Sequence, residues 1–399
     1  MEGVPLVSKS TLIGFAAFLC LIWKFTKSIS EWRIRWIDLP MIVWCFIPIA
    51  TSISNDLGFL DGLSACFTRF FEWGVPYWAG RIVFTGLDDI VLYEKYLFLG
   101  GLIYVPLCLI EIRFSPQLHN FVYGYHQHGF GQTLRMGGFR PTVFMQHGLA
   151  VALWMLAASL SGFTHLIFPK GDTKLAKSFV IWAWVLIFTF FLCKSTGAIV
   201  LFLFCAMGIY LGVKRANAKI LKLLIWIPPL YIGTRSTGLW SAENLVKMSV
   251  QLFGEERAES LAFRIMNENL IVFHAWARPF LGWGGWGRAA VINPATSKLT
   301  IFDGLWGIAF GVNGYIGLVS ITLATLIPVL VAFRRFPPKT WALRDNIPVV
   351  TLMFIGAAYA VDNLLNNMPN SFLLMGVGAL LTQGFRPFTV SEVKNTYTL

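Results

Sequence analysis

Apolar residues dominate the chain and form about eleven long runs that are separated by polar segments. The runs do not alternate between apolar and polar residues with a period of two, and most are long enough for a helix to cross a lipid bilayer. Because every backbone amide in lipid needs an internal partner, such runs predict membrane-spanning helices. The predicted spans are residues 6–23, 38–54, 64–84, 94–112, 143–163, 177–193, 197–213, 219–235, 304–333, 347–361 and 371–384.

One long polar stretch, residues 236–303, interrupts this pattern between the eighth and ninth predicted spans. Residues 255–277 within it repeat apolar side chains at steps of three, four or five, which predicts a helix. The repeating residues are Leu261, Ile265, Leu270, Phe273 and Ala277. The sequence therefore predicts an all-α polytopic membrane protein: a single transmembrane domain over residues 1–399, with about eleven transmembrane helices and one long extracytoplasmic loop that contains short helices.

The composition excludes an ordinary soluble enzyme. Charged residues make up only 13% of the chain, whereas a soluble domain carries roughly 25%. The net charge of +12 falls mostly in short loops between the spans, so we expect membrane lipids and no nucleic acid as partners. Six cysteines lie in or beside apolar runs without a C-x-x-C motif, which predicts neither a disulfide framework nor a zinc site.

Four clusters of Lys and Arg predict the orientation, because positively charged loops stay in the cytoplasm. They lie in residues 24–35, 170–177, 214–222 and 334–344. Eleven spans place all four clusters on one side. The N-terminus, which we expect to be a retained span and not a cleaved signal, then lies outside, together with residues 113–141, 194–197, 236–303 and 362–371.

The first candidate site is Arg135–Pro141, which reads RMGGFRP just before the fifth predicted span. The guanidinium groups of Arg135 and Arg140 can bind phosphate with two hydrogen bonds each, and the glycines between them let the backbone approach a ligand. The alternative is simple anchoring, because arginines at helix ends often extend to lipid headgroups.

The second candidate lies in the long polar stretch, where arginines and tryptophans gather. It contains Arg264, His274, Trp276, Arg278, Trp283, Trp286 and Arg288. Tryptophan can stack on a sugar face, but it also favours membrane interfaces, so an interfacial belt is the alternative. Three glycines in this stretch fit G-x-G-x-x-G. No strand precedes them, so a dinucleotide site is rejected.

Two groups of polar residues beside predicted spans are further candidates. The carboxylate of Asp303 can accept a proton from a hydroxyl, or it can cap the following helix. Residues 362–370, which include Asp362 and four asparagines, can bind sugar hydroxyls or form an outer turn. For His119, His126 and His128, a solvated loop is favoured over a metal site.

Taken in order, these pieces resemble the O-antigen ligase and polymerase family of bacterial membrane proteins. Three motifs carry the likeness: residues 135–144 before the fifth span, residues 264–284 with their arginine helix and Pro, Gly-x-Gly turn, and residues 303–318 at the start of the ninth span. The likeness covers residues 94–334, approximately, and the number of spans and the position of the long loop agree with it.

The resemblance implies a metal-independent membrane glycosyltransferase of the bacterial inner (cytoplasmic) membrane that needs no cofactor. Such enzymes take a glycan from undecaprenyl pyrophosphate and join it to a hydroxyl of a glycan or lipid acceptor at the outer face. The resemblance implies that Arg135 and Arg264 hold the leaving pyrophosphate, with Arg140 and Arg288 as further phosphate or glycan contacts. The remaining candidates for substrate binding are Lys194, His274, Trp283 and Trp286.

Two positions depart from the family pattern. The ligases place a histidine eleven residues before the glycine of the last motif, where this chain has Asp303 as the candidate base. The family often has Ser-Arg-Gly-Ala at a short outer turn, where this chain has STGA at residues 195–198, and Lys194 either replaces the missing charge or is silent. The alternative functions are a polysaccharide or lipid transporter or flippase without chemistry, and a degenerate scaffold. Few charged residues in the spans and no internal repeat disfavour a transporter.

Overall fold

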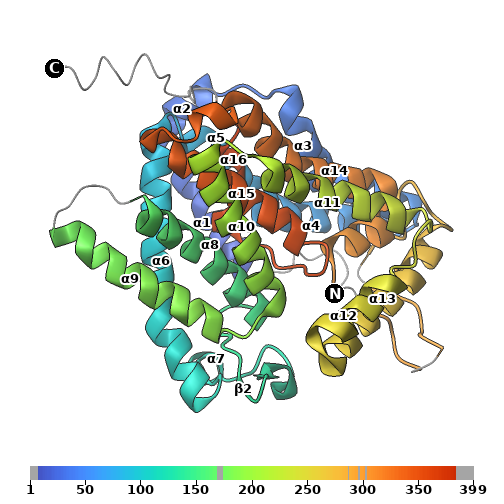
Figure 1. The fold of residues 1–399 in the computed structure, drawn as a ribbon. Coiled ribbons are helices and arrows are strands. Elements are labelled where there is room, and N and C mark those ends of the chain that lie inside the picture. The colour runs from blue at the N-terminus through green and yellow to red at the C-terminus, as the bar shows by residue number, and fades with distance from the viewer. Residues whose placement is uncertain (1–7, 169–173, 286, 295–296, 302, 383–399) are drawn as a thin grey trace. The chain divides into compact units, whose positions relative to one another are not determined.

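The computed structural model of this protein describes residues 8–168, 174–285, 287–294, 297–301 and 303–382. These residues are all-α apart from one hairpin of two short strands (Figure 1). Among them, five helices are long and apolar enough to cross a membrane: Trp36–Ser54, Leu87–Phe114, Gly148–Ile167, Thr196–Arg215 and Leu305–Arg335. The chain therefore has the helical content and the apolar helices of a membrane protein.

Each of the eleven predicted spans contains a helix among the described residues. The helices are α1 (Lys9–Lys24), α3 (Leu39–Ser54), α4 (Phe59–Arg69) followed by α5 (Val75–Val83), α6 (Leu87–Phe114), α8 (Gly148–Ile167), α9 (Lys174–Leu192), α10 (Thr196–Arg215), α11 (Lys219–Ser236), α14 (Leu305–Arg335), α15 (Ile347–Asp362) and α16 (Ser371–Ala379). Five of the eleven coincide with the long apolar helices, so an eleven-span topology stays a prediction.

The remaining described elements are short or lie in the polar stretch. They are α2 (Thr26–Glu31), α7 (Leu118–Tyr123), β1 (Leu134–Arg135), β2 (Gly138–Phe139), α12 (Glu243–Phe253), α13 (Glu255–Ala275), a π-helical turn at Phe70–Gly74 and 3-10 turns at Trp36–Asp38, Phe130–Thr133, Pro338–Thr340 and Arg344–Asn346. The π-helical turn joins α4 to α5 and divides the third predicted span into two short helices.

The chain divides into two compact units, each of which is described by itself. The first unit contains residues 1–79, 225–327 and 363–367, and the second contains residues 80–224, 328–362 and 368–399. This division cannot be predicted from the sequence, because its boundaries fall inside helices: α5, α11 and α14 each contribute residues to both units.

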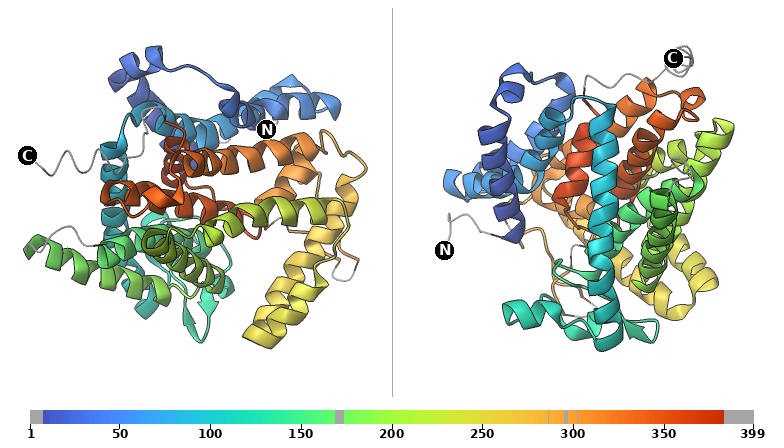
Figure 2. Two further views of the ribbon diagram at one scale, coloured as in Figure 1. Left: turned by 45° about the horizontal axis from the view of Figure 1, so that its top comes forward. Right: turned by 90° about the vertical axis from the view of Figure 1, so that its left-hand side faces the viewer.

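Helices α8 and α15 form the core of the second unit, and α6, α9 and α10 pack against α8 (Figure 2). Small residues on α8 let its neighbours approach closely, as in membrane helix pairs generally. A Cβ at Gly101 of α6 would overlap Ala158 of α8. Polar groups are paired inside this core: the Thr164 hydroxyl donates to the carboxylate of Glu94 at 2.8 Å.

Helix α14 is broken inside its apolar length, in the first unit. Gly314 has φ 60° and ψ −163°, which interrupts the helical hydrogen bonds. The segment Pro279–Gly284 replaces them: the amides of Trp283 and Gly284 donate to carbonyl oxygens at 3.0 Å on Gly311 and Val312, and the Tyr315 amide donates to Pro279 at 2.7 Å. A Cβ on Gly314 would overlap the backbone of Phe280, so this close approach requires glycine. Two of the three glycines of the rejected dinucleotide motif, Gly282 and Gly284, therefore belong to a segment that pairs with the broken helix.

The helix predicted over residues 255–277 is confirmed as α13, which packs against α12 in the first unit (Figures 1 and 2). Its buried face differs from the prediction. Ile265 is buried, but Phe273 is 74% exposed. Ile271 and Val272 are buried as well, together with the polar residues Asn267 and Glu268, whose side chains have hydrogen-bond partners in the first unit.

Candidate functional site

Two of the three predicted catalytic residues, Arg264 and Asp303, form an ion pair in the first unit. The Nε atom of Arg264 lies 3.4 Å from Oδ2 of Asp303, and the side chains are 23% and 35% exposed. The Nη1 atom of Arg264 also donates to the Leu365 carbonyl at 3.3 Å and to Oδ1 of Asn366 at 3.4 Å. All these contacts are long for charge-assisted hydrogen bonds, so the guanidinium can exchange them for a stronger anion.

Asp303 does not cap α14. The first amide of that helix, on Leu305, donates to the carbonyl oxygens of Asn363 and Asn366 at 3.0 and 3.2 Å. The Asp303 carboxylate lies against Arg264 instead. Burial raises the pKa of Asp303 above its ordinary value of 3.8, and the charge of Arg264 opposes this rise. A carboxylate whose pKa is raised is a better base for a hydroxyl proton.

The asparagine segment forms part of the same site. Asn363 is 6% exposed, and neither side-chain atom of Asn363 has a hydrogen-bond partner among the described residues. A buried amide left in this state calls for a polar ligand or a water molecule. Asn370 is different, because its side chain accepts a hydrogen bond from the Leu373 amide and caps α16. Asn370 therefore has a structural role as a helix cap, and the ligand interpretation stays open for Asn363.

One turn further along α13 lies a buried ion pair that the sequence did not reveal. The Nη2 atom of Arg235, at the end of α11, lies 3.0 Å from Oε2 of Glu268, and the side chains are 1% and 8% exposed. The Tyr231 hydroxyl donates to the same oxygen at 2.8 Å, and Nη1 of Arg235 donates to Oδ1 of Asn269 at 2.6 Å. Two features of the sequence could have indicated this pair: Glu268 follows Arg264 by one helical turn, and Arg235 ends a long apolar run.

The two ion pairs share one helix face. Arg264 and Glu268 are neighbours on α13, and they contact Asp303 and the Trp306 indole at the start of α14. Burial raises the pKa of Glu268, while hydrogen bonds from Tyr231 and Arg235 lower it. The buried pair fastens α13 to the end of α11, one turn away from Arg264.

Trp283 is stacked within the first unit. Its ring lies on the His274 ring at a centroid distance of 4.2 Å and an angle of 3°, and Arg278 lies over it at 5.1 Å. Its indole Nε1 donates to the His274 carbonyl at 3.0 Å. A sugar would therefore meet a ring that already has partners, and this favours a structural role for Trp283 and His274.

Arg288 anchors the end of the same stretch. It is exposed, and its Nη1 donates to the Asn55 carbonyl at 3.2 Å. Asn55 in turn donates to the Gly282 carbonyl at 3.0 Å. Trp286, also predicted to bind substrate, lies outside the described residues.

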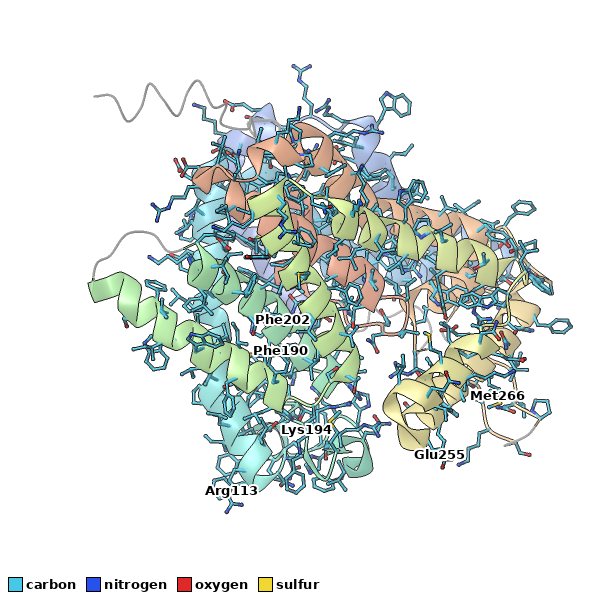
Figure 3. All side chains as sticks on the ribbon, viewed as in Figure 1. Arg113, Phe190, Lys194, Phe202, Glu255 and Met266 are labelled. Atoms are coloured by element: carbon cyan, nitrogen blue, oxygen red, sulfur yellow. The ribbon has the colours of Figure 1, made fainter. Side chains whose placement is uncertain are left out.

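The remaining predicted cations gather in the second unit, at the hairpin of β1 and β2. Lys194 lies at the turn between α9 and α10 (Figure 3), and the rings of Phe190 and Phe202 on these two helices are tilted by 49° with their centroids 5.3 Å apart. Its Nζ lies 3.5 Å from the carbonyl oxygen of Met136 at the hairpin tip. Lys194 therefore reaches the motif that carries Arg135, and its role as a replacement charge stays a prediction. The Nε of Arg135 is buried without a hydrogen-bond partner in the described part of the chain.

A buried carboxylate holds the segment after this hairpin. Glu111, at the end of α6, is fully buried and accepts hydrogen bonds from the amides of Leu118, Thr142 and Val143 at 3.0, 2.8 and 2.7 Å. These bonds hold residues 142 and 143 outside α8, which starts at Gly148 and not at the predicted 143. Arg140 is 5% exposed and its stem lies against Gly148, so it is less accessible than Arg135.

The candidate residues thus form two groups. Arg264, Asp303, His274, Trp283 and Arg288 belong to the first unit, and Arg135, Arg140 and Lys194 belong to the second. That Arg135 meets Arg264 and Asp303 in one cavity stays a prediction. Neither the models of known protein families nor the sequences of curated proteins match this chain. Function is therefore argued from the residues themselves.

Proposed function

We propose that this protein transfers or polymerises polysaccharide units, using a glycan carried on undecaprenyl pyrophosphate, at the outer face of the bacterial inner membrane. The observation that supports this proposal most is the half-exposed Arg264–Asp303 ion pair in the polar stretch. In the proposal, Asp303 is the base and Arg264 is the cation that binds phosphate. An arginine and a carboxylate side by side suit a reaction in which an anion leaves and a hydroxyl loses its proton.

In the proposed reaction, Asp303 accepts the proton of the acceptor hydroxyl. The hydroxyl oxygen bonds to the anomeric carbon of the donor glycan, and the bond between that carbon and the pyrophosphate oxygen breaks. Undecaprenyl pyrophosphate leaves with the electron pair, and Arg264 stabilises the charge on its oxygens. The loose contacts of Arg264 with Leu365 and Asn366 leave it free to turn towards phosphate.

The hairpin cations of the second unit form a candidate phosphate-binding group of their own. Among the described residues, neither Arg135 nor Lys194 forms an ion pair with a carboxylate. The carboxylate of Glu111 in the same unit already accepts hydrogen bonds from three backbone amides. Unpaired cations beside apolar helices suit the phosphates of a lipid carrier. The partners are then the lipid-linked glycan, a glycan or lipid acceptor, and membrane lipids.

The proposal is tested by reconstituting the protein with an undecaprenyl-pyrophosphate-linked glycan and measuring transferred product. Asp303→Asn and Arg264→Ala should each lower the rate by about 10²–10³-fold, as loss of a residue that stabilises developing charge does. Glu259→Gln is the matched control, because it neutralises an exposed carboxylate on the same helix. Equal product from the wild type and both site variants would remove Arg264 and Asp303 from the reaction.

The predicted orientation has its own test. Ala289 is 1% exposed and unsuitable for labelling, whereas Ile292 in the same stretch is 67% exposed. In a Cys20→Ser background, which removes the exposed native cysteine, Ile292→Cys should react with a membrane-impermeant maleimide in intact cells. Ala216→Cys, in a basic loop, should react only after permeabilisation. The reverse pattern would place the polar stretch in the cytoplasm and contradict the proposal.

One observation favours the alternative of a transporter, namely the break in α14. Discontinuous helices form substrate and ion sites in many transporters. The hydrogen-bonding groups around this break, however, are taken by Pro279–Gly284, and the nearby Asn313 accepts from Arg69 at 2.5 Å. A transporter site needs open groups, so glycan transfer is the stronger proposal. Movement of labelled lipid-linked glycan across vesicles without product formation would reverse this order.

A further inference from the structure

Four histidines from distant parts of the sequence line one small pocket in the second unit. They are His119 of α7, His126 and His128 of the following loop, and His147 at the start of α8. Gln127 and Gln132 line the same pocket. The loop interpretation is correct for His126 and His128, which are exposed, but His119 is only 2% exposed. Gln132 and Thr133 lead directly into β1, so the pocket adjoins the hairpin that carries Arg135.

The size and donors of the pocket restrict its ligand. Its volume of about 20 Å³ has room for roughly one water molecule, which excludes a sugar ring. No three His, Cys, Asp or Glu side chains within the described residues come together as a metal-binding group. Imidazole side chains take up protons between about pH 5 and 8, so protonation is the chemistry that this cluster offers.

The hydrogen bonds of His147 fix its protonation state. The backbone amide of Leu149 donates to Nδ1 of His147 at 3.0 Å, which caps α8. An amide can only donate, so Nδ1 carries no proton. The other nitrogen, Nε2, lies 3.1 Å from Oε1 of Gln132 and therefore carries the proton. This arrangement exists only while the imidazole is neutral.

Acid must disturb this arrangement. A proton on Nδ1 would place two donors, Nδ1–H and the Leu149 amide, against each other. The ring must then leave the end of α8, and Gln132, which is bound to the same ring, loses its anchor. A cation at a helix N-terminus is also opposed by the helix dipole.

The charged neighbours increase this sensitivity. The His128 ring lies 4.9 Å from the His147 ring, so two protonated rings would repel each other. Arg140, a permanent cation, packs against Gly148. The carboxylate of Glu111 of α6, which binds residues 142 and 143 just before His147, accepts hydrogen bonds from three amides. His119 and His126 are the other titratable groups at the pocket.

His119 behaves differently and serves as an internal contrast. Its Nδ1 donates to the Tyr125 carbonyl at 2.8 Å, and its Nε2 accepts from Nε2 of Gln127 at 2.8 Å. Oε1 of Gln127 is buried without a hydrogen-bond partner among the described atoms. Rotation of that amide would offer Oε1 to a protonated His119, so acid does not break this contact.

We propose that His147 is an acid-sensitive latch that holds the Arg135 hairpin to the start of α8, and that protonation releases both. The latch regulates the hairpin that binds anions in the proposed function, so its biological role rests on that proposed function. Its mechanism needs no substrate. Stability at the latch is present above the ordinary imidazole pKa of about 6.5 and is lost as the pH falls below it.

The decisive variant is His147→Asn, because asparagine is a preferred helix N-cap and does not titrate. Hydrogen exchange of the purified protein in detergent is compared at about pH 7.5 and about pH 5.5, on either side of the imidazole value, after correction for intrinsic exchange. In the wild type, the peptides of residues 134–140 and 147–152 should lose protection by about fivefold in acid, as expected for loss of a cap. His147→Asn should show equal protection at both pH values, and His126→Asn, the matched control, should respond like the wild type.

Three results would overturn the latch: no loss of protection in the wild type, the same loss in His147→Asn, or a loss confined to α8 while the hairpin stays protected. None of these results changes the outcome expected from the transfer assay with Asp303→Asn and Arg264→Ala. Conversely, a failed transfer assay leaves the exchange result standing, so the two proposals can fail separately.

Discussion

The first unit contains two arginine–carboxylate pairs one helical turn apart, and they differ in almost every physical respect. Arg235 and Glu268 are buried, joined at 3.0 Å and supported by Tyr231 and Asn269. Arg264 and Asp303 are half-exposed and 3.4 Å apart. The same two chemical groups thus give a rigid connection in one place and an exchangeable pair in the other, and burial is what separates them.

The difference teaches which pair can do chemistry. A buried charge that loses its partner is strongly unfavourable, so the Arg235–Glu268 pair cannot release its guanidinium to a substrate. A half-exposed pair contributes little to stability because solvent screens it, and its groups can change partners at small cost. Tight bonding at one turn of α13 therefore positions the loosely bonded residue at the next.

The largest expected effect comes from breaking the buried pair. Glu268→Ala should lower the free energy of unfolding by about 3–5 kcal/mol, because it leaves the Arg235 guanidinium buried and unpaired. Denaturant titration in detergent micelles, followed by tryptophan fluorescence, measures this loss. The double variant Arg235→Met with Glu268→Leu should recover most of it. A loss below about 1 kcal/mol in the single variant would show that the pair behaves as a surface ion pair.

The second effect is a contrast between stability and rate at the exposed pair. Asp303→Asn should change the free energy of unfolding by about 0–1 kcal/mol, while transfer falls by about 10²–10³-fold. Equal losses in both measurements would make Asp303 a structural residue. The same titration and the transfer assay, run on one preparation, separate the two outcomes.

The smallest effect is a shift of the acid limb of the rate. Asp303 must be ionised to accept a proton, so transfer should fall as the pH decreases through its pKa, which burial holds above 3.8. Removing the opposing charge with Arg264→Met should move the limb of the residual rate to higher pH. The sign for stability is opposite: a carboxyl with a raised pKa binds its proton more tightly in the folded state, so its contribution is present in acid and lost as the pH rises. An unmoved limb would assign it to another group.

The helical and apolar character of the fold could be predicted from the sequence, because long apolar runs have few alternatives in lipid. Helix α13 was predictable as well, since its apolar residues repeat with the helical period. Its buried face was not, because Glu268 is buried only by virtue of Arg235, which lies 33 residues earlier in the chain. Likewise, Lys194 reaches Met136 across 58 residues, and no local pattern records that distance. Hydrogen bonds and ion pairs between residues far apart in the chain could not be predicted from the periodicity of apolar residues.

The break in α14 has a consequence for how the protein is made. The backbone groups on either side of Gly314 are completed by residues 279–284, which precede the helix in the chain. Open amides and carbonyls are poorly tolerated in a bilayer. In the predicted topology, where α14 spans the membrane, this helix therefore inserts only together with the glycine-rich segment synthesised just before it, and a change in that segment would impair insertion of the helix.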